Sequence, residues 1–175
     1  SRLRWVQTLA AGPDGVLAAG FGPAVTITNG RGLHTHTVAE TALALALAGI
    51  LRLPAMLAAQ RDHHWAYEEF GQWRDLHPAG RIGSLIDTNV LVWGFGDIGT
   101  KIAQLFTAVG ARVRGIATSA GARSGFEIFT DADLPRLLPQ TDVLVMVLPH
   151  AESTRHALDA DRMALLPSHA WLVNV

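Results

Sequence analysis

Apolar and polar segments divide the chain into two halves, and the first half is built around one long apolar run. Two shorter apolar runs precede it, at 4–12 and 24–29, and each predicts a strand because it is closed by glycine or asparagine. The leucines of the long run, 38–51, alternate as in a strand. However, alanine is the strongest helix former and TVAE at 37–40 is typical of a capping box, so we predict a helix. Because this helix is apolar on nearly all sides, we expect it to be buried between lobes or subunits.

The second half alternates strand and helix patterns. Pro54 predicts the first turn of a helix that reaches about Trp65, and the glycines and proline of 71–88 predict a linker. The strands predicted beyond the linker are 89–94, 111–117, 142–149 and 170–175, and the helices are 98–109, 131–138 and 159–166. Such alternation predicts βαβ units and a parallel sheet. We therefore expect an α/β protein with a first lobe over 1–70, the linker over 71–88 and a second lobe over 89–175.

Charge and composition exclude several classes of function. The formal net charge of the 175 residues is −1 and the isoelectric point is about 6.7, whereas binding nucleic-acid phosphates requires a basic face. Cysteine is absent, which excludes disulfides, a cysteine-based zinc site and a cysteine nucleophile. Arg52 and Pro54 interrupt the longest apolar stretch well short of the ~20 residues that span a bilayer. We expect a cytoplasmic protein with no nucleic-acid and no membrane partner.

A glycine motif at the first strand–helix junction of the second half carries the candidate chemistry. It reads Gly94-x-Gly96-x-x-Gly99, between the predicted strand 89–94 and the predicted helix 98–109. In this context Gly94 permits the tight turn, Gly96 lets the backbone approach a pyrophosphate, and Gly99 lets the helix pack closely on the strand. The N–H groups at the helix start then face the negative charge. The motif predicts a dinucleotide site, and the alternative is a glycine-rich turn without a ligand.

Two histidine pairs are candidates for metal ligands, His34 with His36 and His63 with His64. No carboxylate or cysteine stands at ligand spacing from them, so we interpret them as surface or capping residues and predict no metal site.

Several segments, in their order along the chain, together resemble the D-isomer-specific 2-hydroxyacid dehydrogenase family, which includes glyoxylate/hydroxypyruvate reductases. RWVQTLAAGPDGV resembles the substrate-lobe strand and its SAGVD loop, and HTHTVAETALALALAGILRLP resembles the VAE helix between the lobes. VLVWGFGDIGTKIAQ resembles the cofactor loop, TDVLVMVLPHAESTRHAL the segment that usually ends LPLTxET, and AWLVNV the opening of LVNVGRG. The resemblance runs the whole length of the chain, and the order of the segments is far more specific than any one of them.

The resemblance implies a fold and an activity. The fold would be a Rossmann-type doubly wound parallel sheet with part of a flavodoxin-like substrate lobe. The activity would be hydride transfer between NAD(P)H and a small 2-keto acid or D-2-hydroxy acid, catalysed by an arginine, an acidic residue and a histidine. The arginine would lie two residues beyond Val175 and the other two further on, so we expect an inactive middle part of a longer enzyme, with no catalytic residue of its own. The alternatives are a non-catalytic dinucleotide-binding regulator or corepressor and an inactive structural remnant.

The resemblance also assigns binding residues. Ala11 and Gly12 would bind the substrate carboxylate through backbone N–H groups; the alternative is an ordinary turn. His150 borders the expected nicotinamide crevice, but we interpret it as a neighbour of the ligands because the family places its base elsewhere. Asn174 would contact the cofactor, or its side chain would hold a turn. Besides Asn174 and the three glycines of the motif, the expected cofactor-binding residues are Phe95, Asp97, Ile98, Leu148, Pro149 and Thr154.

The loop after the second strand of the second lobe indicates which nicotinamide cofactor is used. An NAD site normally has Asp or Glu there, about 20 residues past the glycines, and Ala117 stands at this position. Thr118, Ser119 and Arg123 follow, and two hydroxyls with a guanidinium suit an adenosine 2′-phosphate. We predict that NADP is preferred over NAD. The alternative is an NAD site without an acid, in which Arg123 is a solvated loop residue.

A partner is also implied. The helix over 38–51 is too apolar to face water, and in the family this region helps to form a two-fold dimer. We expect a homodimer that buries this helix in an isologous interface.

Overall fold

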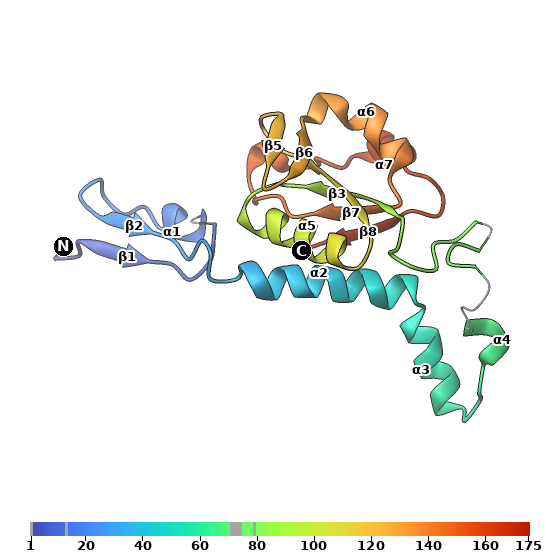
Figure 1. Cartoon of the computed structure of the whole chain (residues 1–175). Coiled ribbons are helices and arrows are strands. Elements are labelled where there is room, and N and C mark those ends of the chain that lie inside the picture. The colour runs from blue at the N-terminus through green and yellow to red at the C-terminus, as the bar shows by residue number, and fades with distance from the viewer. Residues whose placement is uncertain (1, 13, 71–74, 79) are drawn as a thin grey trace.

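The computed structural model describes residues 2–12, 14–70, 75–78 and 80–175 (Figure 1). A small two-stranded sheet lies at the N-terminal side, a long helix runs beneath a six-stranded sheet, and two shorter helices extend away from the main body. Residues 71–74 and 79 of the expected linker lie outside the described residues. The division of the chain at 70 and 88 therefore stays a prediction.

The N-terminal segment forms two parallel strands joined by a short helix. β1 (Trp5–Gln7) pairs with β2 (Thr26–Thr28), and α1 (Asp14–Ala18) lies between them in the sequence. Both strands were predicted, although each is only three residues long. One side chain per strand is half-buried, Val6 opposite Ile27, so this pair of strands has little core of its own.

One face of the long helix α2 (Thr35–Ile50) is buried inside the chain. Ala39, Ala42, Ala46 and Ile50 repeat every three or four residues, which places them on one side of the helix. This helix packs against α5 (Asp97–Ala108) and β8 (Trp171–Asn174). On the other face Leu45 is 51% exposed.

The expected capping box at the start of α2 is wrong. The helix begins at Thr35, and the hydroxyl of Thr37 donates to the carbonyl oxygen of His34 (3.3 Å) instead of accepting a backbone N–H. Threonine inside a first turn can bond back to a preceding carbonyl, and here the two residues before Thr37 continue the helix.

A bend separates α2 from the arm that follows. Arg52 has a left-handed backbone (φ 58°), and its guanidinium donates to the carbonyl of Glu69 (3.2 Å) and lies over the ring of Phe70. The arm consists of α3 (Leu53–Arg61) and α4 (Tyr67–Phe70). α3 ends before the expected Trp65, because His63 adopts φ 53° and closes the last turn. Within the described residues no single helix has the length and composition to cross a membrane; α2 and α3 meet that test only as a pair bent by 62°.

The second half forms the six-stranded sheet, in the order β5-β6-β4-β3-β7-β8. All neighbouring strands are parallel except β5 and β6. The remaining strands are β3 (Asn89–Trp93), β4 (Arg112–Ile116), β5 (Gly121–Arg123), β6 (Phe126–Phe129) and β7 (Val143–Met146). The predicted α/β class and Rossmann-type parallel sheet are confirmed.

The antiparallel hairpin of β5 and β6 was not predicted. Ser124 and Gly125 form its turn, both with positive φ (52° and 85°), as two-residue hairpin loops require. The expected loop over this segment is therefore wrong, since Arg123 stands in β5 opposite Phe126.

Helices cover both faces of this sheet (Figure 1). On the face of α2 and α5 the core includes Phe95, Ile102, Phe106 and Val145. On the other face lie α6 (Leu134–Leu137), η2 (Leu138–Gln140) and α7 (Ala160–Ala164). Two further short 3-10 helices are η1 (Asp131–Asp133) and η3 (Glu152–Thr154). The helix expected at 131–138 is split into short pieces, because Pro135 and Pro139 cannot donate the backbone bonds of a continuous helix.

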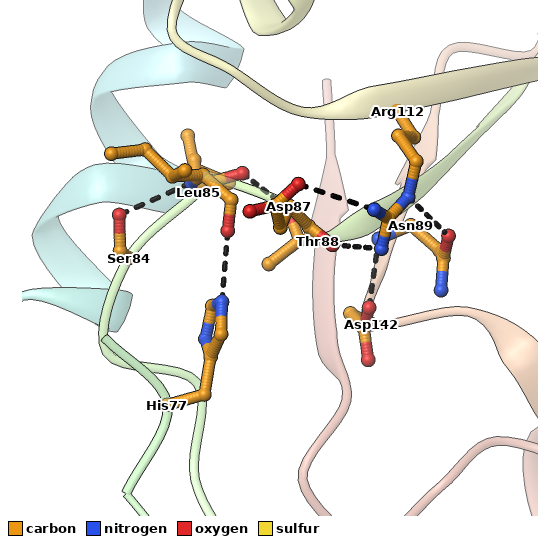
Figure 2. Close-up of polar contacts among 9 residues, drawn as sticks. His77, Ser84, Leu85, Asp87, Thr88, Asn89, Arg112 and Asp142 are labelled. Carbon is orange, nitrogen blue, oxygen red and sulfur yellow. Dashed lines mark hydrogen bonds and ion pairs between the residues drawn. The ribbon is translucent and has the colours of Figure 1, made fainter. Parts of the chain in front are cut away.

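A polar network joins the amino ends of the central strands (Figure 2). Arg112, at the start of β4, donates to Asp87 (3.2 Å) and to the side chain of Asn89 (3.3 Å). The backbone N–H of Asn89, at the start of β3, donates to Asp142 (2.7 Å), which also lies 3.0 Å from His169. These contacts hold the amino edge of the sheet together. The loops with the expected cofactor-binding residues lie at the opposite, carboxyl edge of this sheet.

Candidate cofactor site

The turn between β3 and α5 contains three glycines. The packing of the protein leaves no room for a side chain at Gly94 and Gly99, but it leaves room at Gly96. Gly94 has φ 108°, and a Cβ there would lie 2.4 Å from the carbonyl oxygen of Val147. A Cβ on Gly99 would lie 2.1 Å from the carbonyl oxygen of Gly94. Gly96 is exposed, and a Cβ there would meet nothing within 4 Å. The backbone at the start of α5 is therefore open on the side of Gly96, which is what the approach of a pyrophosphate requires.

The turn is anchored to β4 by its second residue. The N–H groups of Gly94 and Phe95 donate to the carbonyl of Ile116 (3.0 and 3.1 Å). The ring of Phe95 is buried and occupies the place of a side chain on Gly115, where a Cβ would lie 2.1 Å from it. It also packs against Phe126 at a centroid distance of 5.7 Å. Phe95 thus contributes only its backbone to the open side of the turn, and Ile98 is half-buried behind it.

Asp97, the first residue of α5, forms an ion pair that sequence analysis missed. Its Oδ2 accepts from Nε of Arg31 at 2.8 Å. This hydrogen bond, and secondly the positive charge, hold the pKa of Asp97 below its ordinary value, and they raise the pKa of Arg31. Both groups are ionised at neutral pH. Because the pKa of Asp97 is lowered, the pair persists to a lower pH than an ordinary aspartate would allow, and it is lost as the pH falls through that lowered pKa. No pattern in a single sequence connects two residues 66 positions apart.

Arg123 points from β5 into the cofactor turn. One nitrogen of its guanidinium donates to the carbonyl of Phe95 (3.1 Å), and the other donates to the hydroxyl (2.7 Å) and carbonyl (3.2 Å) of Ser119. The guanidinium carries more N–H groups than these contacts use. Thr118 and Ser119 are exposed at the end of β4, and Ala117 is half-buried. The structure brings Arg123 and Ser119 together beside the glycine turn.

The other expected cofactor residues lie past the ends of β7 and β8. Leu148 is half-buried against the second core, and Pro149 is exposed. The hydroxyl of Thr154 lies 2.6 Å from the carbonyl oxygen of Pro149 and accepts from the N–H of Ala151 (3.1 Å), so it ties this loop together. Asn174 is exposed at the end of β8, and His150 is exposed beyond Pro149.

The expected substrate loop follows β1. Ala11 and Gly12 are exposed there. The loop packs on the segment after β2, since the N–H of Gly30 donates to the carbonyl of Ala10 (2.9 Å) and a Cβ on Gly30 would lie 2.1 Å from the carbonyl oxygen of Leu9. The next residue, Arg31, reaches the cofactor turn.

Two hollows of about 300 and 410 Å³ lie away from this turn. Both include His169 and Arg81, and the smaller one also includes His77, Asp87 and Asp142 of the amino edge. They are remote from the glycine turn, so we do not assign the cofactor to them. His34, His36, His63 and His64 are exposed, and no cluster of three potential metal ligands occurs among the described residues.

Comparison with known proteins decides the family. Residues 43–175 match the profile described as D-isomer specific 2-hydroxyacid dehydrogenase, NAD binding domain. The chain belongs to the D-isomer specific 2-hydroxyacid dehydrogenase family. This confirms the resemblance inferred from the ordered motifs.

Relatives of this dehydrogenase chain include a glyoxylate reductase of Aeropyrum pernix, 30% identical over 99% of the chain and 51% of the relative. A D-isomer specific 2-hydroxyacid dehydrogenase family protein of Aeromonas salmonicida superposes with a TM-score of 0.83 at 29% identity, over 99% of this chain and 52% of that one. An NADPH-dependent glyoxylate/hydroxypyruvate reductase of Sinorhizobium meliloti, in complex with NADP and sulfate, superposes with a TM-score of 0.78 at 28% identity, over 98% and 52%. The chain spans about half the length of each.

The contrast between Gly96 and Gly99 predicts different effects for alanine at the two positions. Gly99→Ala forces a methyl group against a backbone carbonyl, and we expect it to destabilise the protein by about 1–3 kcal/mol. Gly96→Ala has open space, and we expect less than about 1 kcal/mol of destabilisation from the poorer helix cap. However, its methyl group stands where the pyrophosphate approaches, so we expect the affinity for reduced cofactor to fall at least about tenfold.

Urea unfolding and titration with NADPH on the full-length protein measure both quantities. Equal destabilisation by the two substitutions, or unchanged cofactor affinity in Gly96→Ala, would contradict this assignment of the turn.

Proposed function

We propose that the protein carrying this chain is a cytoplasmic oxidoreductase that transfers a hydride between NAD(P)H and a small 2-keto acid or D-2-hydroxy acid. The observation that carries the proposal is the open backbone at Gly96, at the start of a twelve-residue helix, in a chain of this dehydrogenase family. NAD(P)-dependent hydride transfer on 2-hydroxy acids is what the family and the named relatives support.

Each part of the described site has a role in this reaction. The nicotinamide supplies or accepts the hydride when the cofactor is bound. Gly94, Gly96 and the N–H groups at the start of α5 hold the pyrophosphate, because an exposed helix N-terminus attracts negative charge. Ala11 and Gly12 bind the carboxylate of the substrate through their backbone N–H groups. The loop 148–154 and Asn174 border the nicotinamide.

The groups that move the proton are not among these residues. By the family resemblance, the arginine that polarises the carbonyl oxygen, the histidine base and its acidic partner would be supplied by other parts of the full-length protein. His150 is exposed on the loop after β7, and we assign it no catalytic role.

We propose NADP as the preferred cofactor. A carboxylate at position 117 would repel a 2′-phosphate, and alanine stands there. The guanidinium of Arg123 is held by Ser119 and by the carbonyl of Phe95, so it is preorganised for a phosphate on the adenosine ribose.

We also propose a homodimer. Part of the apolar surface of α2 is buried within the chain, but Leu45, Leu53, Leu57 and Trp65 remain exposed along α2 and the arm. Trp65 is 86% exposed, and Figure 1 shows α3 and α4 extending from the main body. A two-fold interface over this surface would remove these side chains from water.

The first prediction of this proposal concerns turnover. Full-length protein should reduce glyoxylate or hydroxypyruvate with NADPH, whereas the 175 residues alone should be inert. Removing groups that act as a unit typically lowers the rate by many orders of magnitude. The loss of NADPH absorbance follows both reactions. Cofactor-dependent turnover by the 175 residues would contradict the placement of the catalytic groups. If the full-length protein binds NADPH but does not turn it over, the alternative function, a non-catalytic dinucleotide-binding regulator, is favoured.

The second prediction concerns cofactor choice. We expect full-length protein to bind NADPH more tightly than NADH, and Arg123→Ala to weaken NADPH about tenfold to a hundredfold, with little change for NADH. Ala117→Asp should also erode the preference, by repelling the 2′-phosphate. Arg61→Ala, on the exposed end of α3, is the charge-matched control. If Arg123→Ala weakens both cofactors equally, the guanidinium only holds the loop.

The third prediction concerns association. Light scattering at micromolar concentration should give the mass of a dimer, and Trp65→Glu should shift it toward a monomer because a charge would enter an apolar interface. Leu17→Glu introduces the same charge at an exposed leucine on α1, outside this surface, and should leave the mass unchanged. A monomeric parent at this concentration would refute the dimer.

A further inference from the structure

The ion pair of Arg31 and Asp97 joins the N-terminal lobe to the cofactor turn. Arg31 follows β2, and Asp97 is the first residue of α5, directly after Gly96. The two side chains are 70% and 53% exposed, so water and ligands have access to the pair beside the turn.

The carboxylate of Asp97 is unfavourable for pyrophosphate binding when it stands alone. In the free helix it is stabilised by the dipole at the N-terminus. A pyrophosphate at the same N-terminus would be repelled by it, because like charges a few ångströms apart raise each other's energy even near a solvated surface. The guanidinium of Arg31, 2.8 Å from Asp97, cancels this charge.

Arg31 is also placed by the expected substrate loop. The backbone of Gly30 contacts this loop directly. Its N–H donates to the carbonyl of Ala10, and the carbonyl of Leu9 approaches it so closely that a side chain would not fit. A continuous series of contacts thus links the loop that contains Ala11 and Gly12, through Gly30 and Arg31, to Asp97.

We propose that Arg31 is a positioning residue for the dinucleotide: it neutralises Asp97, so that the N-terminus of α5 accepts the pyrophosphate, and it ties the Ala11–Gly12 loop to the cofactor turn. This inference rests on the proposed function. Arg31 acts on the cofactor through Asp97, which distinguishes it from a direct ligand of the phosphate.

A double-mutant cycle on the full-length protein tests the proposal, with dissociation constants for NADPH and NADH measured by fluorescence titration. Arg31→Gln should weaken both cofactors about tenfold, and equally, because the pyrophosphate is common to them. Asp97→Asn should tighten both about threefold, since it removes the repelling charge and leaves the guanidinium. The double variant should return to within about threefold of the parent. Arg31→Lys should retain most of the affinity, because it keeps the charge.

The pair of Arg112 and Asp87 provides the matched control. It is also an exposed arginine–aspartate pair, at 3.2 Å, but it lies at the amino edge of the sheet (Figure 2). Arg112→Gln should leave both dissociation constants unchanged.

Three results would overturn the proposal while leaving the proposed function intact. If Arg31→Gln, Asp97→Asn and the double variant weaken binding to the same extent, the pair only ties the lobes together. If Asp97→Asn does not rescue Arg31→Gln, the guanidinium contacts the cofactor directly. If Arg31→Gln binds both cofactors like the parent, it has no role in the site. A parent protein that binds neither cofactor would overturn the proposed function and this inference with it.

Discussion

The close contact between the glycine turn and the end of β4 is the constraint on which the rest of the site depends. The ring of Phe95 fills the space of a missing side chain at Gly115, and two N–H groups of the turn share the carbonyl of Ile116. On the other side, the first turn of α5 packs on the carbonyl of Gly94. The hydrogen bonds to Ile116, the ring of Phe95 over Gly115 and the close approach of Gly99 to Gly94 together fix the turn against the sheet. Arg123 and Arg31 therefore bind to a turn whose position is already fixed by the sheet.

The two edges of the six-stranded sheet differ: polar contacts at the amino edge hold the strands together, whereas exposed residues at the carboxyl edge are free to bind a ligand. At the amino edge, Arg112, Asp87, Asn89 and Asp142 satisfy one another and hold β3, β4 and β7 in place. At the carboxyl edge, Gly96, Thr118, Pro149 and Asn174 are exposed. This is the edge at which open parallel sheets place their ligands. Substitutions of these exposed residues are consequently expected to have little effect on the core.

Local patterns in the sequence predicted most of the second half of the chain. The apolar runs of β3, β7 and β8 and the spacing of Gly94, Gly96 and Gly99 each depend on neighbouring residues, and these parts agree with the structure. The start of α2 was misplaced, because Thr37 can serve as a cap or as an interior residue of the first turn. The hairpin was missed because its segment, residues 121–129, is short and the residues on either side of it are typical of a polar loop. The contact of Arg31 with Asp97 joins distant segments, and only the fold brings them together.

Because Arg123 stands in the hairpin of β5 and β6, the direction of its side chain depends on the register in which the two strands pair. In a strand successive side chains point to opposite faces, so a shift of one residue would turn Arg123 away from Ser119 and Phe95. The register depends on the two turn residues Ser124 and Gly125, whose positive φ angles suit the tight loop. A single-residue insertion in that turn would therefore redirect the guanidinium without touching any residue of the site. The length of this turn, as well as the identity of its residues, therefore determines where the guanidinium of Arg123 points.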